Sequence, residues 1–263
     1  MLGKLLKYDL KSINIVLIVF YILSIFFSIL TRIFLNIENS FICNVIGHIC
    51  NGTAIAMFFN ILINNVIRLW VRFKQNFYGD ESYLTHTLPV EKKTLYLSKF
   101  ISSVITLFIS VAVIALSLFI AHYSKENIEL IKNLLMPLAT IYDSTVVTVI
   151  ISFVFICFLE IFNMLQSGYF GIIMGHRKNN HKMIYTFVFG FVAYLITQLL
   201  AIAITFLTAL FNKDLMNLFY SVEVLNVDTI KLCIVLAAGV YLANIIILYF
   251  INRKLFSKGV NVD

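Results

Sequence analysis

Six long apolar runs occupy most of the 263-residue chain, and this pattern limits the fold more than any other feature of the sequence. A helix needs about 20 apolar residues to cross the hydrocarbon core of a bilayer. The runs predict membrane-spanning segments at 13–35, 43–70, 97–121, 143–174, 184–210 and 230–251. The composition agrees, because 61% hydrophobic and 13% charged residues are far from the values of a soluble domain. We therefore expect a single transmembrane domain over 1–263.

The spans are predicted to be helices. Each run is continuously apolar and longer than a barrel strand, without the alternation that a transmembrane barrel requires. Both prolines, Pro89 and Pro137, lie in gaps between runs. The first run is too long for the core of a signal peptide and no small-x-small cleavage site follows it, so we expect a retained first span. The expected fold class is an all-α polytopic membrane protein with six transmembrane helices.

The basic residues predict the orientation of the chain. Of the 20 Lys and Arg residues, fifteen lie before the first span, in or beside the gap between the second and third, between the fourth and fifth, or after the last. The positive-inside rule places that side in the cytoplasm, together with both termini. The net charge of +7 is then explained by topology and by anionic lipid headgroups, and we expect no nucleic-acid partner.

The sequence offers no arrangement that predicts catalysis. The nearest approach to a phosphate-binding loop, Gly47, Gly52 and Thr53, lacks the lysine and lies inside a span. Asp143 and Glu160 are 17 residues apart, about 25 Å on one helix, which is too far for a pair of catalytic carboxylates. We therefore expect a non-catalytic chain.

A metal site is not expected either. Cys43, His48 and Cys50 form the only grouping of interest, and their spacing matches no zinc pattern. Cysteines of this kind are ordinary packing residues.

The most distinctive gap is the predicted cytoplasmic segment 71–96, which mixes large aromatic residues with charges. Exposed aromatic residues surrounded by polar groups are typical of interfaces, so this segment predicts a partner. The alternative is a short interfacial loop that packs under its own bundle.

This segment resembles part of a known family. The stretch DESYLTHTLPV at 80–90, followed by KKTLYLSK at 92–99, is similar to the connection between the second and third spans of ABC-2 type permeases. The start, MLGKLLKYDLK, resembles their amphipathic entry helix, which we expect at 1–12. GIIMGHRK at 171–178 resembles the close of their fourth span. The likeness covers the whole chain.

The resemblance implies the membrane-spanning permease subunit of an ABC-2 type transporter in the bacterial cytoplasmic membrane. It implies an exporter of amphipathic peptides, drugs or lipids, with a role in antimicrobial peptide resistance. The partners would be two copies of a separate ABC ATPase, which bind ATP and Mg²⁺, and a second permease chain, identical or similar. The chain itself would hold no cofactor.

In this family the cytoplasmic segment between spans two and three contains a coupling helix that docks on the ATPase. The resemblance assigns this role to Phe77, Tyr78, Asp80, Glu81, Tyr83, Leu84 and His86.

Polar side chains at helical spacing predict faces of the spans that avoid lipid. In span two these are Thr53, Asn60, Asn64 and Arg68, and on the opposite face of its outer half Asn44, His48 and Asn51. In span four they are Glu160, Asn163, Ser167 and Gly171, and in span five Tyr194, Gln198, Thr205 and Thr208. They predict either a pathway or polar packing between helices.

Two features of span four are specific. Glu160 is costly in hydrocarbon and predicts either a functional carboxyl group or one that is hydrogen-bonded to a neighbouring helix. Ser167, Gly171 and Gly175 form a small-xxx-small pattern that allows close approach of another helix, preferably within the chain.

Other interpretations stay open. The gap 211–229 predicts either an interfacial or re-entrant helix, or a simple interfacial loop. A non-transport scaffold, or a sensor subunit of an envelope-stress complex, would need the same spans without an ATPase contact. An intramembrane enzyme ranks last.

Overall fold

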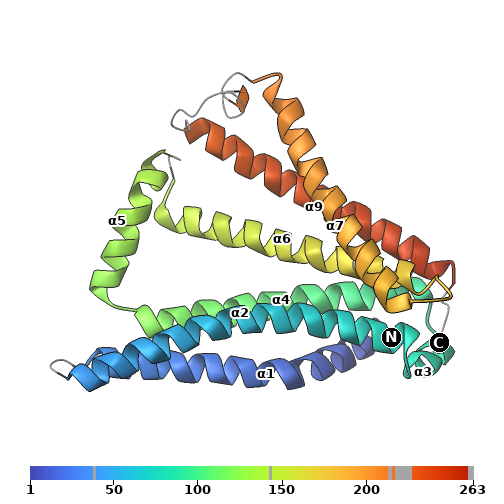
Figure 1. The fold of residues 1–263 in the computed structure, drawn as a ribbon, viewed down its shortest axis with the longest axis horizontal. Coiled ribbons are helices and arrows are strands. Elements are labelled where there is room, and N and C mark those ends of the chain that lie inside the picture. The colour runs from blue at the N-terminus through green and yellow to red at the C-terminus, as the bar shows by residue number, and fades with distance from the viewer. Residues whose placement is uncertain (38–39, 142–143, 213–214, 217–226, 260–263) are drawn as a thin grey trace. The chain divides into compact units, whose positions relative to one another are not determined.

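The computed structural model describes residues 1–37, 40–141, 144–212, 215–216 and 227–259, and these contain helices and no strand. Six helices are long and apolar enough to cross a membrane: α1 (Leu2–Leu35), α2 (Phe41–Tyr78), α4 (Lys92–His122), α6 (Val146–Gly175), α7 (Lys182–Ala209) and α9 (Val227–Ser257) (Figure 1). This confirms the predicted fold class of an all-α, multi-pass membrane protein with six spans. The helix predicted as one alternative for 211–229 falls mostly outside the described residues.

Four spanning helices extend well beyond the predicted spans on the side predicted to be cytoplasmic, among them α9, which continues to Ser257. Helix α1 begins at Leu2, so the expected entry helix at 1–12 is continuous with the first span. Helix α2 continues to Tyr78, and α4 begins at Lys92. The extensions contain charged residues, which hydropathy alone assigns to loops.

Two further helices lie in gaps. The short α3 (Ser82–Thr87) lies in the expected coupling segment. Helix α5 (Lys125–Ile141) follows α4, contains Pro137 and was not predicted. With 17 residues it is shorter than the about 20 residues that a span needs.

The helices form two compact units, Met1–Leu130 and Ile131–Asp263, and α5 contains the boundary. In the first unit α1 and α2 form a hairpin, and α4 packs against both (Figure 1). In the second unit α6 packs against α7 and α9, which also contact each other.

The core of the first unit follows from the spacing of residues on α1. The buried positions recur every three or four residues, as expected for one face of a helix. They are Asp9, Ile13, Leu17, Tyr21, Ser24, Ser28 and Thr31. The face of α4 that packs in this core is rich in hydroxyl residues, and the buried ones are Ser98, Ser102, Ser103, Thr106, Ser110 and Ser117.

These short hydroxyl side chains allow the backbones of α1 and α4 to approach closely. The Ser24 hydroxyl donates to Ser117 Oγ at 2.9 Å, and the hydroxyls of Tyr21 and Ser110 lie 2.8 Å apart. Bonds of this kind contribute about 0.6–2 kcal/mol each between membrane helices. Hydrogen bonds and close packing therefore hold this unit together where lipid gives no hydrophobic drive.

Candidate functional site

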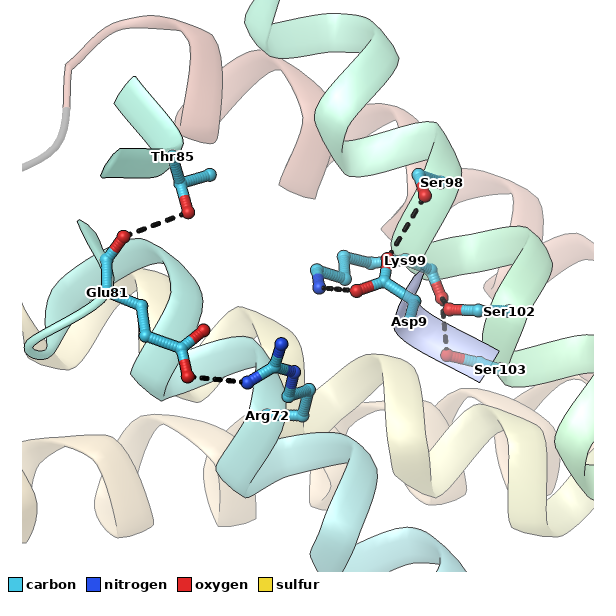
Figure 2. Close-up of polar contacts among 8 residues, drawn as sticks. All are labelled: Asp9, Arg72, Glu81, Thr85, Ser98, Lys99, Ser102 and Ser103. Atoms are coloured by element: carbon cyan, nitrogen blue, oxygen red, sulfur yellow. Dashed lines mark hydrogen bonds and ion pairs between the residues drawn. The ribbon is translucent and has the colours of Figure 1, made fainter. Parts of the chain in front are cut away.

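The connection between α2 and α4 forms a compact turn and a short helix. Helix α2 ends at Tyr78, and the backbone N–H of Ser82 donates to Gly79 O at 2.9 Å. Thr85 Oγ1 then donates to Glu81 O at 3.0 Å, which stabilises the first turn of α3 (Figure 2).

Two side-chain contacts fix α3 to α2. Arg72 Nη1 donates to Glu81 Oε1 at 2.7 Å, so the residue just before α3 is paired with α2 (Figure 2). His86 Nε2 lies 3.2 Å from Phe77 O and bonds to it in the tautomer with a proton on Nε2. The helix is thus held near both of its ends.

The outer face of α3 exposes large apolar side chains. Tyr83 is 76% exposed and Leu84 is 68% exposed, and Leu88 just after the helix is also exposed. Exposed aromatic and apolar side chains beside charged residues are typical of interfaces. These side chains therefore form a candidate docking surface, which we define as Tyr83, Leu84 and Leu88.

The residues expected at the ATPase interface fall into three groups. Tyr83, Leu84 and Asp80 are exposed, whereas Glu81 and His86 are half-buried and hold α3 on α2. Phe77 and Tyr78 are buried. Phe77 packs edge-on against Phe73, with ring centroids 4.9 Å apart. The role of all seven as partner contacts stays a prediction.

A buried ion pair lies in the same end of this unit. Lys99 on α4 donates to Asp9 on α1, and Ser98 Oγ donates to the other carboxylate oxygen of Asp9 at 3.1 Å (Figure 2). Both charged side chains are less than one tenth exposed. The ammonium group also lies 5.5 Å from the centre of the Phe77 ring, within cation–π range. The pair therefore joins α1 and α4 beside the end of α2.

The sequence analysis does not predict this pair. By sequence alone Asp9 belongs to the basic start of the chain, and Lys99 is one of the basic residues that predict orientation. A signal was present, because Asp9 lies four residues before Ile13 and eight before Leu17, on the buried face of α1.

In the second unit, polar residues from three helices meet around Glu160. The Tyr194 hydroxyl donates to Glu160 Oε1 at 2.5 Å, and Gln198 Nε2 donates to the same oxygen at 2.9 Å. The Tyr241 hydroxyl donates to Gln198 Oε1 at 3.3 Å. The polar faces expected on spans four and five therefore contact each other, and Tyr241 on α9 is an unpredicted third contributor.

Asn163 extends this polar contact by one turn of α6. Its side-chain amide donates to Thr197 Oγ1 on α7 at 2.9 Å, and its backbone carbonyl accepts from Ser167 Oγ at 3.0 Å. Further along, Asn252 Nδ2 on α9 donates to Gln166 O at 3.1 Å.

The two glycines expected to allow close packing lie directly against α7. A Cβ added at Gly171 would be 2.4 Å from Thr186 O and 2.6 Å from Gly190 N. One added at Gly175 would be 2.3 Å from Thr186 Oγ1. Only residues without a side chain fit at these positions, so the backbones of α6 and α7 are in contact.

The polar residues expected on span two behave differently. Thr53, Asn60 and Asn64 each donate to a carbonyl four residues earlier on their own helix. The neighbouring Asn65, which lies off the predicted polar face, is buried and donates to Thr106 O at 3.0 Å and Ser110 Oγ at 2.6 Å. Asn65 therefore makes the contact between helices, and the role of the other three stays a prediction.

Within the described residues, no three His, Cys, Asp or Glu side chains are grouped so as to hold a metal ion. Asp143 lies outside those residues, so its relation to Glu160 is not described. Comparisons with protein-family models, with curated proteins and with solved structures found no match for this chain.

Proposed function

We propose that this chain is the membrane-spanning permease subunit of an ABC-2 type transporter, an exporter in the bacterial cytoplasmic membrane. The observation that carries the proposal is the exposure of Tyr83 and Leu84 on helix α3. This helix lies in the connection between the spanning helices α2 and α4. A separate ATPase would dock there, and the resemblance of 80–99 to the coupling segment of these permeases supports the same assignment.

The contacts of α3 suit a helix that transmits motion. Glu81 links it to Arg72 on α2, and His86 links it to the α2 backbone at Phe77. Phe77 in turn contacts Lys99 on α4, which pairs with Asp9 on α1. A displacement of α3 by a bound ATPase would therefore reach all three spanning helices of the first unit.

The proposed cargo is an amphipathic peptide, drug or lipid. An amphipathic cargo has polar and apolar parts. The support is that the second unit places a polar cluster within apolar spans, formed by Glu160, Tyr194, Gln198 and Tyr241. An ionisable side chain in a span is costly and is usually retained for function. In this account two ATPases and a second permease chain complete the transporter.

Co-purification tests the proposal. The tagged chain is extracted in mild detergent, and co-purifying proteins are identified by mass spectrometry. Tyr83→Ala with Leu84→Ala is the test variant, because both side chains are exposed and the bonds that fix α3 to α2 come from Glu81 and His86. Loss of an interface anchor of this kind corresponds to about tenfold weaker binding or more.

The control is Tyr123→Ala, because this tyrosine is 50% exposed and lies at the predicted outer end of α4. The proposal expects an ATP-binding chain with the wild type and the control, and a strong loss with the double variant. Absence of any ATP-binding chain from the wild type, even after cross-linking in the membrane, would instead favour the scaffold or sensor.

A further inference from the structure

A small recess lies between α1 and α2 at the end of the first unit that the sequence predicts to be cytoplasmic. It is lined by Ser12, Ile13, Arg68, Arg72 and Gln75. The three α2 residues are spaced by four and three positions, so they share one face of that helix. The recess thus combines two guanidinium groups, a hydroxyl and a carboxamide.

Most of these polar groups have no partner among the residues that the structure describes. Within the described part of the chain, the side chains of Arg68, Ser12 and Gln75 make no hydrogen bond or ion pair. All three carry N–H or O–H donors. A ligand with several acceptor oxygens would match them.

The local charge favours an anion. Glu81 is bonded to Arg72, and Asp9 is bonded to Lys99, so each nearby carboxylate already has its own cation. Arg68 has no acidic partner among the described residues and leaves the recess with an excess positive charge. A guanidinium group matches phosphate oxygens in shape as well as in charge.

The depth of the recess identifies the source of the phosphate. The hydropathy pattern places the boundary of the hydrocarbon near residues 13 and 70, and the recess spans this level with Ile13 and Arg68 on one side and Gln75 on the other. Lipid phosphates are concentrated in this layer, and basic recesses between helices on the cytoplasmic side bind acidic headgroups.

We propose that the recess formed by Ser12, Arg68, Arg72 and Gln75 binds the phosphate of an anionic membrane lipid. Arg68 supplies the main attraction, and Ser12 and Gln75 donate to the phosphate oxygens. Arg72 stays bonded to Glu81 through Nη1 and offers its remaining N–H donors. A bound headgroup would join α1 to α2 next to the residue pair that holds α3. This assignment goes beyond the proposed transport function and stands without it.

Native mass spectrometry of the full chain in a neutral detergent tests the site. The number of bound lipids is measured as phosphatidylglycerol is added, with phosphatidylcholine in a second series. Arg68→Gln removes the unpaired charge, and Ser12→Ala removes one donor without a change of charge. Lys93→Gln is the matched control, because Lys93 is exposed and its loss changes the net charge equally.

We expect the wild type and Lys93→Gln to retain phosphatidylglycerol in preference to phosphatidylcholine. Arg68→Gln should weaken retention about fivefold, as expected for one basic residue near an anionic headgroup. Ser12→Ala should give a smaller loss in the same direction.

Three outcomes would overturn the proposal. The first is an equal loss for Arg68→Gln and Lys93→Gln, which would indicate a diffuse effect of net charge. The second is equal retention of phosphatidylcholine by the wild type. The third comes from a competition series, where displacement of phosphatidylglycerol by millimolar sodium phosphate would assign the recess to free phosphate.

Discussion

Lys99 on α4 donates to Asp9 on α1 although the two residues are 90 positions apart in the sequence. Both are buried, and Ser98 also donates to Asp9. The pair joins the start of α1 to the start of α4. It lies at the end of the first unit that also contains α3. Isolated charges are very costly in such a place, so each depends on the other.

Removal of one member of this pair should destabilise the first unit strongly. Asp9→Ala leaves the Lys99 ammonium buried without a counter-charge, which costs about 3–5 kcal/mol. The free energy of unfolding of the purified chain in detergent measures the effect. Addition of Lys99→Met should restore most of the loss, because an apolar pair carries no desolvation penalty.

The control for that comparison is Lys11→Ala, since Lys11 is exposed on the same helix. It should change the free energy of unfolding by less than about 0.5 kcal/mol. A loss for Asp9→Ala no greater than for Lys11→Ala, or no recovery in the double variant, would show that the pair does not stabilise the unit.

Gly171→Ala should disrupt the packing of α6 on α7. The new Cβ would meet Thr186 O and Gly190 N at 2.4 and 2.6 Å, so the two backbones must separate. We expect a loss of about 1–3 kcal/mol in the free energy of unfolding. Gly239→Ala on α9 is the control, because nothing lies within 4 Å of its added Cβ.

That control should be neutral or slightly stabilising, since Ala has a higher helix propensity than Gly by up to about 1 kcal/mol. Equal effects of the two substitutions would contradict the close contact between α6 and α7.

Glu160→Leu should destabilise the second unit, whereas Glu160→Gln should not. Leucine leaves the Tyr194 hydroxyl and the Gln198 amide without their acceptor, at about 1–3 kcal/mol. Glutamine keeps a carbonyl oxygen for both donors and should cost less than about 1 kcal/mol.

Thermal unfolding in detergent compares the Glu160 variants with Cys157→Leu, an exposed position one turn earlier on α6. A loss for Glu160→Gln as large as that for Glu160→Leu would mean that the fold requires the carboxylate charge and not only an acceptor for Tyr194 and Gln198.

The predicted orientation is testable by cysteine labelling in intact cells. With the four native cysteines replaced, Ser124→Cys should react with a membrane-impermeant maleimide, whereas Lys93→Cys should react only after lysis. Ser124 follows the predicted outer end of α4, and Lys93 lies at its predicted cytoplasmic start. The reverse labelling pattern would show the opposite orientation. Helix α3 would then lie outside the cell, where it could not contact a cytoplasmic ATPase.

The six spans could be predicted because a run of about 20 apolar residues has few other stable structures in a membrane protein. Helix α5 could not be predicted in this way, because Lys125, Glu126, Glu129 and Lys132 interrupt its apolar residues. The ends of the helices could not be predicted either. Hydropathy indicates which residues lie in the hydrocarbon core, and α2 continues beyond that layer to Tyr78.

Some of the polar contacts between helices could be predicted from the sequence and others could not. The helical spacing of Glu160 and Asn163 placed them on one face, and the structure pairs that face with Tyr194 and Thr197. The choice between Asn64 and Asn65 was beyond the sequence, because it depends on the rotation of α2 against α4. Helical spacing shows which residues share one face of a helix. It does not show which other helix packs against that face.

The most direct measurement of the central claim is site-specific photo-cross-linking in living cells. A photoreactive amino acid replaces Tyr83 on α3, and in a second strain Tyr123 at the predicted outer end of α4. The account predicts that position 83 captures an ATP-binding chain and that position 123 does not. Capture of no nucleotide-binding protein at position 83, or equal capture at both positions, would contradict it.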